Sequence, residues 1–399
     1  MISVLPVPRF FLKMKRKVII IGGPTGVGKS ELAFRLAEKL EGELISCDSV
    51  QVYKELEIGA NKTAVGTPGR EHLLDLVDWT EEFTAADFYD HCTKKMEEIL
   101  GRERIPILVG GTGFYLDWIL RGRPSAPPTD PDVLKSIEAE LDESNWTACF
   151  KKLQEVDPEY SKVILPNDFY RLKRALAVHR ATGFPLSHYK RTHSKFLESC
   201  DFRCFFITAD REYICRNIDW RCEEMLVKGL LEEVVTLNKR GLTKECKAGR
   251  SIGYFESFNF LEALESIELS ETGDINKEQI KAFSTFLDEF KSSTRQYSRK
   301  QENWFASKSE FKWIRRPTPF VPIDPDNSSL FSLVLKAIQS PREEYDALDG
   351  WLAEEDSLAR DLVTDQVRKK MKCYKGPPTR FTGKVLDEFL KRTLKLIHK

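Results

Sequence analysis

The sequence lacks two features that would place it in a membrane or in an oxidising compartment. None of its apolar runs approaches the roughly 20 residues that span a lipid bilayer, so we expect no membrane association. The nine cysteines include no Cys-x-x-Cys pair, which favours free thiols in an intracellular compartment. The spacings of His188, His193, Cys200 and Cys204 do not match those of common zinc ligand pairs, and no zinc site is expected there.

Net charge is also absent, because 62 basic residues balance 62 acidic ones. The balance hides a local asymmetry. Residues 341–361 contain eight acids and two bases, whereas residues 366–399 contain eleven bases and two acids. Nucleic acid therefore stays among the candidate partners. Residues 1–17 contain five bases and no acid, which fits a mitochondrial or plastid transit segment and, nearly as well, a solvated basic leader.

Short apolar runs alternate with helical patterns along the first part of the chain, which predicts a parallel sheet with helices on both faces. Functional groups of such a sheet gather beyond the carboxyl ends of its strands. The expected strands are residues 17–21, 43–47, 105–109 and 202–209, and the expected helices are residues 30–40, 85–100, 218–240 and 278–305.

Proline and other residues that interrupt helices and strands are concentrated in residues 123–129, which indicates a domain boundary. The residues that follow contain helical patterns and no convincing strand until residue 202. The sequence therefore predicts an α/β core interrupted by a helical insertion, with a separate tail. Its parts are a leader (1–16), the core (17–128 and 202–316), the insertion (129–201), and a tail that is first acidic and then basic (317–399).

The strongest motif is Gly-Pro-Thr-Gly-Val-Gly-Lys-Ser at residues 23–30, which fits the P-loop pattern G-x-x-x-x-G-K-[ST] between a strand and a helix. Backbone amides and the helix N-terminus of such a loop surround phosphate oxygens. Lys29 adds a mobile cation, and the Ser30 hydroxyl is placed to ligate Mg²⁺. A diphosphate or triphosphate is thus expected to bind Gly23, Pro24, Thr25, Gly26, Val27, Gly28, Lys29 and Ser30.

Two polar residues follow other expected strands. Asp48 follows the second strand, where a carboxylate could be a general base, a Mg²⁺ ligand or a helix cap. Thr112 lies in the glycine-rich turn after the third strand and offers a hydroxyl to the same site. Either residue could instead serve only the turn. The P-loop alone leaves the reaction open and also fits a small-molecule kinase.

Basic residues recur at helical spacing in two places. Lys291, Arg295 and Arg299 stand four residues apart and share one helix face, which suits either phosphate contacts or a solvated surface. Within the insertion, residues 167–195 interleave Lys and Arg with Phe and Tyr around a single acid. Such a mixture is typical of single-stranded RNA recognition, but it also fits a solvated helix face over buried aromatic rings.

In order along the chain stand the P-loop, Asp-Ser-Val-Gln-Val-Tyr at 48–53, Gly-Gly-Thr-Gly-Phe-Tyr at 110–115, Asn-Asp at 167–168 with two arginines after it, Arg-Ser-Ile-Gly-Tyr at 250–254, and Thr-Arg-Gln at 294–296 through Trp-Phe at 304–305. Over residues 17–316 the chain resembles the tRNA dimethylallyltransferases (tRNA isopentenyltransferases). The resemblance implies a P-loop NTPase-like α/β core. It also implies transfer of a dimethylallyl group from its diphosphate to N6 of the adenosine just 3′ of a tRNA anticodon, without ATP hydrolysis.

The resemblance also implies roles for single residues. Asp48 would take the amine proton and Thr112 would orient the amine by a hydrogen bond, while Lys29, Arg250 and Mg²⁺ on Ser30 would stabilise the diphosphate. We expect a monomer whose partners are dimethylallyl diphosphate and tRNA. The implied tRNA contacts are Ser49, Gln51, Tyr53, Lys62, Arg171, Arg174, Arg295, Gln296 and Arg299.

Three alternatives stay open. An adenylate isopentenyltransferase shares the first half of the pattern, but the helical insertion and the later blocks favour the tRNA-directed family. A P-loop kinase would leave the Thr112 and Gln296 blocks unexplained. A non-catalytic RNA-binding protein would have no need of the complete set Lys29, Ser30, Asp48 and Arg250.

Overall fold

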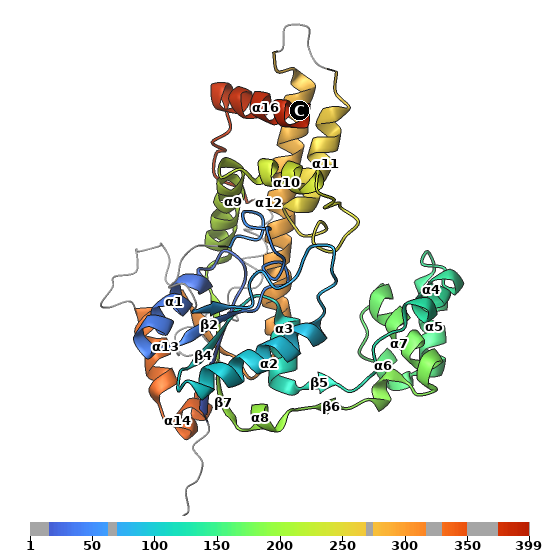
Figure 1. The fold of residues 1–399 in the computed structure, drawn as a ribbon, viewed down its shortest axis with the longest axis vertical. Helices are drawn as coiled ribbons and strands as arrows, with labels where there is room; N and C mark the ends of the chain where they lie inside the picture. Colours follow the sequence, from blue (N-terminus) through green and yellow to red (C-terminus); the bar gives the residue numbers. More distant parts are fainter. Residues whose placement is uncertain (1–15, 63–69, 269–273, 317–328, 349–373, 399) are drawn as a thin grey trace, which may run out of the picture. The chain divides into compact units, whose positions relative to one another are not determined.

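The chain folds into two compact units (Figure 1). The computed structural model describes residues 16–62, 70–268, 274–316, 329–348 and 374–398. Unit 1 is Met1–Leu116 with Ser199–Lys399, and unit 2 is Asp117–Glu198. Unit 2 thus begins at Asp117 rather than at residue 129 and ends at Glu198 rather than at residue 201. Apart from Arg16, the expected leader lies outside the described residues.

Unit 1 contains a six-stranded sheet in the order β3-β2-β4-β1-β7-β8, and all its neighbouring strands are parallel. The four expected strands are all present, and the α/β fold class is confirmed. β3 and β8, at the two edges, were not expected from the sequence. The strands are β1 Arg16–Gly22, β2 Glu43–Ser46, β3 Glu71–His72, β4 Pro106–Gly110, β7 Cys200–Thr208 and β8 Lys312–Arg315.

The core of unit 1 lies around the central strand. Val18, Ile19, Ile20 and Ile21 of β1 have no exposed surface, as expected for a parallel strand covered on both faces. The helices are α1 Lys29–Leu40, α2 Ala85–Gly101, α3 Gly113–Arg121 (which runs into unit 2), α9 Arg211–Val227, α10 Leu230–Asn238, α11 Tyr254–Glu265, α12 Lys277–Phe305, α13 Ser329–Gln339, α14 Arg342–Ala347 and α16 Gly383–Ile397.

The helices of unit 1 pack in two groups. α1 lies against β1, β2 and β4, and α2 lies against β2 and β4. α9, α10, α11 and α12 pack on one another beyond the sheet. The helix expected at 218–240 is two helices, because Gly229 adopts a positive φ of 103° between α9 and α10, a conformation that favours glycine.

The expected tail is not separate from the core. Its described parts, residues 329–348 and 374–398, belong to unit 1. α13 packs on α1, and α16 packs on α10 and α11. The physical reason is burial of aromatic surface, since Phe381 and Phe389 lie against Phe283 with ring centroids 5.2 and 5.3 Å away. Residues 349–373, which hold much of the acidic and basic runs, lie outside the described residues.

Unit 2 is a small helical body with its own core, formed around Ile137, Leu153 and Leu172. Four of its helices begin at a capping side chain, Asp130, Asn145, Asp157 or Asp168. Its elements are α4 Pro131–Glu140, α5 Trp146–Val156, α6 Pro158–Ser161, α7 Phe169–Thr182, the 3₁₀ helix η1 Leu186–His188, α8 Lys195–Glu198 and the antiparallel pair β5 Arg123–Pro124 and β6 Arg191–Thr192.

Within the described ranges, the structure shows neither a candidate membrane-spanning helix nor a disulfide. No helix within them is both long enough and apolar enough to cross a membrane. Their eight cysteines are all free, and seven are buried. They contain no group of three or more His, Cys, Asp or Glu residues that could hold a metal ion.

Candidate functional site

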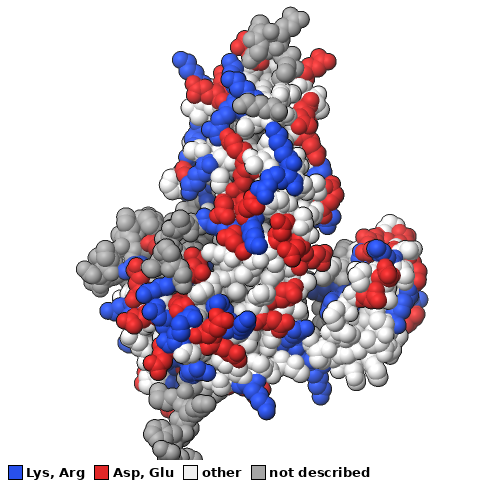
Figure 2. Space-filling model, in the orientation of Figure 1, with Lys and Arg blue, Asp and Glu red and all other residues white. Residues whose placement is uncertain are grey.

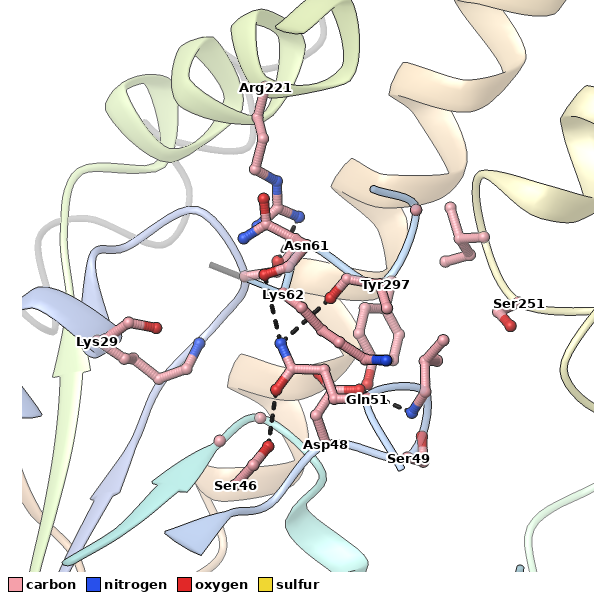
Figure 3. Close-up of a pocket in the computed structure, with 18 of the residues that line it drawn as sticks. Lys29, Ser46, Asp48, Ser49, Gln51, Asn61, Lys62, Arg221, Ser251 and Tyr297 are labelled. Carbon is pink, nitrogen blue, oxygen red and sulfur yellow. Dashed lines mark hydrogen bonds between the residues drawn. The ribbon is translucent and has the colours of Figure 1, made fainter. Parts of the chain in front are cut away.

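A cavity of about 330 Å³ opens beyond the carboxyl ends of β1, β2 and β4 in unit 1. Figure 3 shows Lys29, Asp48 and Arg221 reaching into it from three different elements. α9 and α12 contribute further wall residues, among them Tyr297. Of the residues that the sequence pointed to, eight line this cavity: Thr25, Lys29, Ser30, Asp48, Ser49, Gln51, Lys62 and Arg250.

The P-loop places Lys29 at the start of α1, inside the cavity. Gly28, at the N-terminus of this helix, has a φ of 89°, and a Cβ there would lie 1.9 Å from Nη1 of Arg316. The Lys29 ammonium donates to the Pro24 carbonyl oxygen at 2.9 Å. Burial, with a smaller contribution from the Arg221 cation, lowers the pKa of Lys29 to about 7, although Asp48 acts in the opposite direction.

Arg221 of α9 is a site residue that the sequence analysis missed. Its Nη2 donates to the Thr25 hydroxyl at 2.6 Å, and one turn earlier Asn217 donates to the Gly26 carbonyl oxygen at 3.1 Å. Burial lowers the pKa of the Arg221 guanidinium. Within the described part of the chain, neither Lys29 nor Arg221 forms an ion pair, and the Arg221 Nε has no hydrogen-bond partner. Two half-buried cations that bond to the P-loop rather than to an acid suit an anionic ligand.

Gln301 of α12 joins the ends of β1 and β4. Its Oε1 accepts from the Thr25 amide at 2.8 Å, and its Nε2 donates to the Gly111 carbonyl oxygen at 3.0 Å. A Cβ on Gly111 would lie 2.0 Å from that Nε2, so this close approach requires glycine. Both the amide and the hydroxyl of Thr25 are therefore engaged within the protein. Because the hydroxyl accepts from Arg221, its own proton stays available for a phosphate oxygen.

Asp48 follows β2 and lines the same cavity as Lys29 of the P-loop, on which its charge acts. One carboxylate oxygen accepts from the Val50 amide at 2.8 Å, which fixes the side chain. The Thr112 hydroxyl is buried and lies beside the Tyr297 hydroxyl, but it is not part of the cavity wall. Tyr297 is part of that wall, and burial, reinforced by Asp48, raises its pKa to about 12. The sequence did not point to Tyr297.

The loop after Asp48 is held by its own polar residues. Gln51 accepts from the Ser46 hydroxyl at 2.7 Å and donates to the Ala60 carbonyl oxygen at 3.1 Å. Lys62 donates to the Tyr53 carbonyl oxygen at 2.7 Å and pairs with two acids. The expectation that the Tyr53 side chain contacts tRNA is wrong, because only 1% of this residue is exposed and it belongs to the core.

The basic stripe expected on α12 does not form one exposed face. Lys291 is buried and donates to Glu223 at 2.7 Å, and Arg295 pairs with the buried Asp219. Only Gln296 and Arg299 of the expected contacts on this helix are exposed. Bases and acids are interleaved over the described surface drawn in Figure 2, so charge alone does not mark an RNA-binding face there.

The remaining expected residues lie in two separate places. Arg250, in the loop before α11, is exposed and lines the cavity. Arg171 and Arg174 are on α7 of unit 2. Arg171 pairs with Asp168, the N-cap of that helix, and Arg174 donates to the Thr129 hydroxyl at 3.3 Å.

Comparison with known proteins identifies the family of the chain. The family described as IPP transferase matches residues 51–308 of the chain. The chain belongs to that family. The tRNA dimethylallyltransferase of Protochlamydia amoebophila (strain UWE25) is 35% identical over 311 residues, which cover 77% of this chain and 86% of the relative. The tRNA dimethylallyltransferase 9 of Arabidopsis thaliana is 29% identical over 404 residues, an alignment that covers 92% of this chain and 83% of the relative.

Solved structures of IPP transferases share this fold. The full-length tRNA isopentenylpyrophosphate transferase of Bacillus halodurans aligns with a TM-score of 0.57 and 29% identity, over 84% of this chain and all of that one. The resemblance to tRNA dimethylallyltransferases is thereby confirmed, and the chain is a transferase. The family match ends at residue 308, so β8 and the C-terminal helices lie beyond it.

Proposed function

We propose that this transferase moves a dimethylallyl group from dimethylallyl diphosphate to N6 of the adenosine 3′ of the anticodon in tRNA. The observation that carries the proposal is that one cavity is lined by two half-buried cations, Lys29 and Arg221, which form no ion pair within the described residues, and by the Asp48 carboxylate. Such a site can accept an anionic leaving group at one end and a proton at the other. Membership in the IPP transferase family supports the choice of reaction.

The donor diphosphate would bind at the P-loop end. Lys29, Arg221 and Arg250 supply positive charge where the bond from the allylic carbon to the diphosphate oxygen breaks. The hard oxygen donors of Ser30 and Asp48 line the same cavity and suit Mg²⁺, which prefers such ligands. A Mg²⁺ ion held by Ser30 would neutralise charge on the departing diphosphate.

The acceptor amine would be activated at the other end. The N6 lone pair of adenosine is delocalised into the ring, so the amine is a poor nucleophile until a base removes a proton. As the new N–C bond forms, the proton would pass to Asp48, and the diphosphate would leave with the electron pair of the broken C–O bond. Thr112, whose buried hydroxyl lies beside that of the cavity-lining Tyr297, is proposed to orient the amine.

The acceptor base must leave its stack to reach such a cavity, and the surrounding RNA needs a surface of its own. Unit 2 offers Tyr170, which is 76% exposed, beside Arg171 at the start of α7. Flat rings with nearby cations suit splayed loop bases and their phosphates. The other proposed tRNA contacts are Arg174 in unit 2 and Ser49, Gln51, Lys62, Arg295, Gln296 and Arg299 in unit 1. The monomeric state, the intracellular location and targeting by the leader stay predictions from the sequence.

A transfer assay tests the proposal. Labelled dimethylallyl diphosphate and Mg²⁺ are incubated with the protein and either unmodified tRNA or AMP, and the product nucleoside is identified after digestion. We expect label at N6 of the adenosine next to the anticodon and none in AMP. Label only in AMP would instead establish an adenylate isopentenyltransferase. No label in either would overturn prenyl transfer, and ATP turnover would then test the kinase alternative.

A further inference from the structure

The C-terminal segment Tyr374–Ile397 lies on the helices that wall the cavity, although it lies beyond the family match. This segment comprises an extended stretch followed by α16. α16 packs on α10 and α11, across the upper end of the helices in Figure 1. The arrangement raises the question of what these residues contribute to a site that they do not line.

The helix α9 presents different residues on two opposite faces. Asn217 and Arg221 share one face and hold the P-loop. Asp219 and Glu223 are offset from them by two residues, which is about 200° around an α-helix. Both acids are buried, with 1% and 3% of their surfaces exposed. The cavity and this acidic face therefore lie on opposite sides of the same helix.

Each of these two acids is shared between α12 and the C-terminal segment. Asp219 accepts from Arg295 of α12 and from the Tyr374 hydroxyl, the latter at 2.8 Å. Glu223 accepts from Lys291 of α12 at 2.7 Å and from the Arg380 amide at 3.0 Å. Buried carboxylates are stable only when they are paired, so both partners of each acid fix the position of α9.

The segment is itself anchored on the helices below it. Phe381 and Leu390 are buried, and the Phe389 ring lies 4.8 Å from that of Phe381. Arg392 pairs with Glu232 of α10, and Arg380 also reaches Glu224 of α9. The apolar anchors thus lie between polar contacts on both sides, and residues Tyr374–Ile397 form a strap across α9.

We propose that this strap sets the position of Arg221 over the P-loop and thereby determines how tightly the site holds a diphosphate. Tyr374 and Arg380 are positioning residues that act on the acidic face of α9, and Arg221 on the opposite face carries the effect to the anion. The inference rests on the proposed function only for the identity of the donor, because the binding of inorganic diphosphate needs no transfer reaction.

The test is a calorimetric titration of the full-length protein with inorganic diphosphate and Mg²⁺. Tyr374→Phe removes the hydroxyl that Asp219 accepts from and keeps the ring. We expect the dissociation constant to rise about fivefold in the otherwise unchanged protein, but less than about twofold in an Arg221→Gln background, because coupled residues are not additive. Arg380→Met is the second strap variant; it keeps the backbone amide but removes the ion pairs of the Arg380 side chain with Glu223 and Glu224, at 3.3 and 2.5 Å, and should behave in the same way. Lys395→Ala, an exposed residue of α16, is the matched control and should change nothing.

Three results would overturn the proposal. An equal loss of affinity with and without Arg221 would show a general weakening of the fold. Unchanged affinity in both strap variants would show that α9 is held without the strap. A rise in the KM for tRNA, with diphosphate binding unchanged, would make the segment an RNA-binding surface. Thermal melting of each variant keeps unfolded protein out of the comparison, and diphosphate binding without transfer would count against the proposed function alone.

Discussion

The two units hold their cations in different ways. In unit 1, Lys29 and Arg221 are half-buried and bonded to a carbonyl and a hydroxyl of the P-loop rather than to acids. In unit 2, Arg171 pairs with Asp168 at the surface. Exposed pairs of this kind contribute only about 0–1 kcal/mol, so a phosphate can replace the acid at little cost. Cations that are held by the P-loop without an acid partner instead favour one anion in one position, and this contrast predicts separate effects on the two substrates.

The largest expected effect comes from the Asp48 carboxylate, which lines the cavity together with the two cations. Asp48→Asn should lower kcat by about 10²–10⁴, the usual contribution of a general base. The affinity for dimethylallyl diphosphate should stay the same or increase, because a negative charge near the P-loop is removed. Single-turnover transfer and equilibrium donor binding measure the two quantities. An unchanged rate would show that Asp48 is not the general base.

The next effect concerns the protonation of Lys29. Its pKa is lowered to about 7, so Lys29 loses its charge in the free protein as the pH rises through 7. Above this pH, Lys29 must take up a proton when the diphosphate binds. Donor affinity should fall about tenfold between pH 6 and pH 8. Calorimetry in buffers of different ionisation enthalpy should show proton uptake near pH 8. In Lys29→Met this uptake should disappear, and its persistence there would assign the proton to another group.

A smaller and different effect is expected from unit 2. The double variant Arg171→Ala and Arg174→Ala should raise the KM for tRNA severalfold and reduce its dependence on salt by about one unit of slope per lost phosphate contact. The KM for the donor should not change. Arg180→Ala is the matched control, since this residue is near the other end of α7 and is held by both oxygens of Glu140. A change in the KM for the donor would contradict the prediction that unit 2 affects only tRNA binding.

The smallest effect is expected from Tyr53→Phe. This side chain is buried in unit 1, so loss of its hydroxyl should leave the KM for tRNA unchanged within about twofold, as for most substitutions away from a functional surface. Steady-state kinetics with tRNA as the varied substrate is sufficient. A loss as large as that of the double arginine variant would mean that the loop around Tyr53 opens when RNA binds.

Local patterns were enough to predict the strands of the sheet, the P-loop and the place of Asp48. Each depends on a short apolar run or on a motif at the end of one. The contacts that complete the cavity are different in kind. Gln301 and Thr25 are 276 positions apart, and nothing near Arg221 in the sequence distinguishes it from the exposed Arg216 on the same helix.

The prediction of an exposed basic stripe on α12 was wrong for a related reason. A spacing of four residues shows that side chains share a face, but not whether that face meets solvent or protein. Asp219 and Glu223 on α9 have the same spacing as Lys291 and Arg295, so a search for matching acid and base pairs on two helices would have found the partner. Tyr53 was predicted to contact tRNA because a motif shows which residues occur together, but not which of them are buried.

The order of the strands has a consequence for the synthesis of the protein on the ribosome. β1 lies between β4 and β7, so it can pair on one side once residue 110 has emerged, but on the other side only after residue 208. Throughout the translation of unit 2, the nascent chain therefore carries an unpaired strand edge flanked by Val18 to Ile21, which the finished protein buries completely. An apolar edge of this kind is a template for aggregation. Rapid, independent folding of unit 2 would shorten the time for which that edge is open.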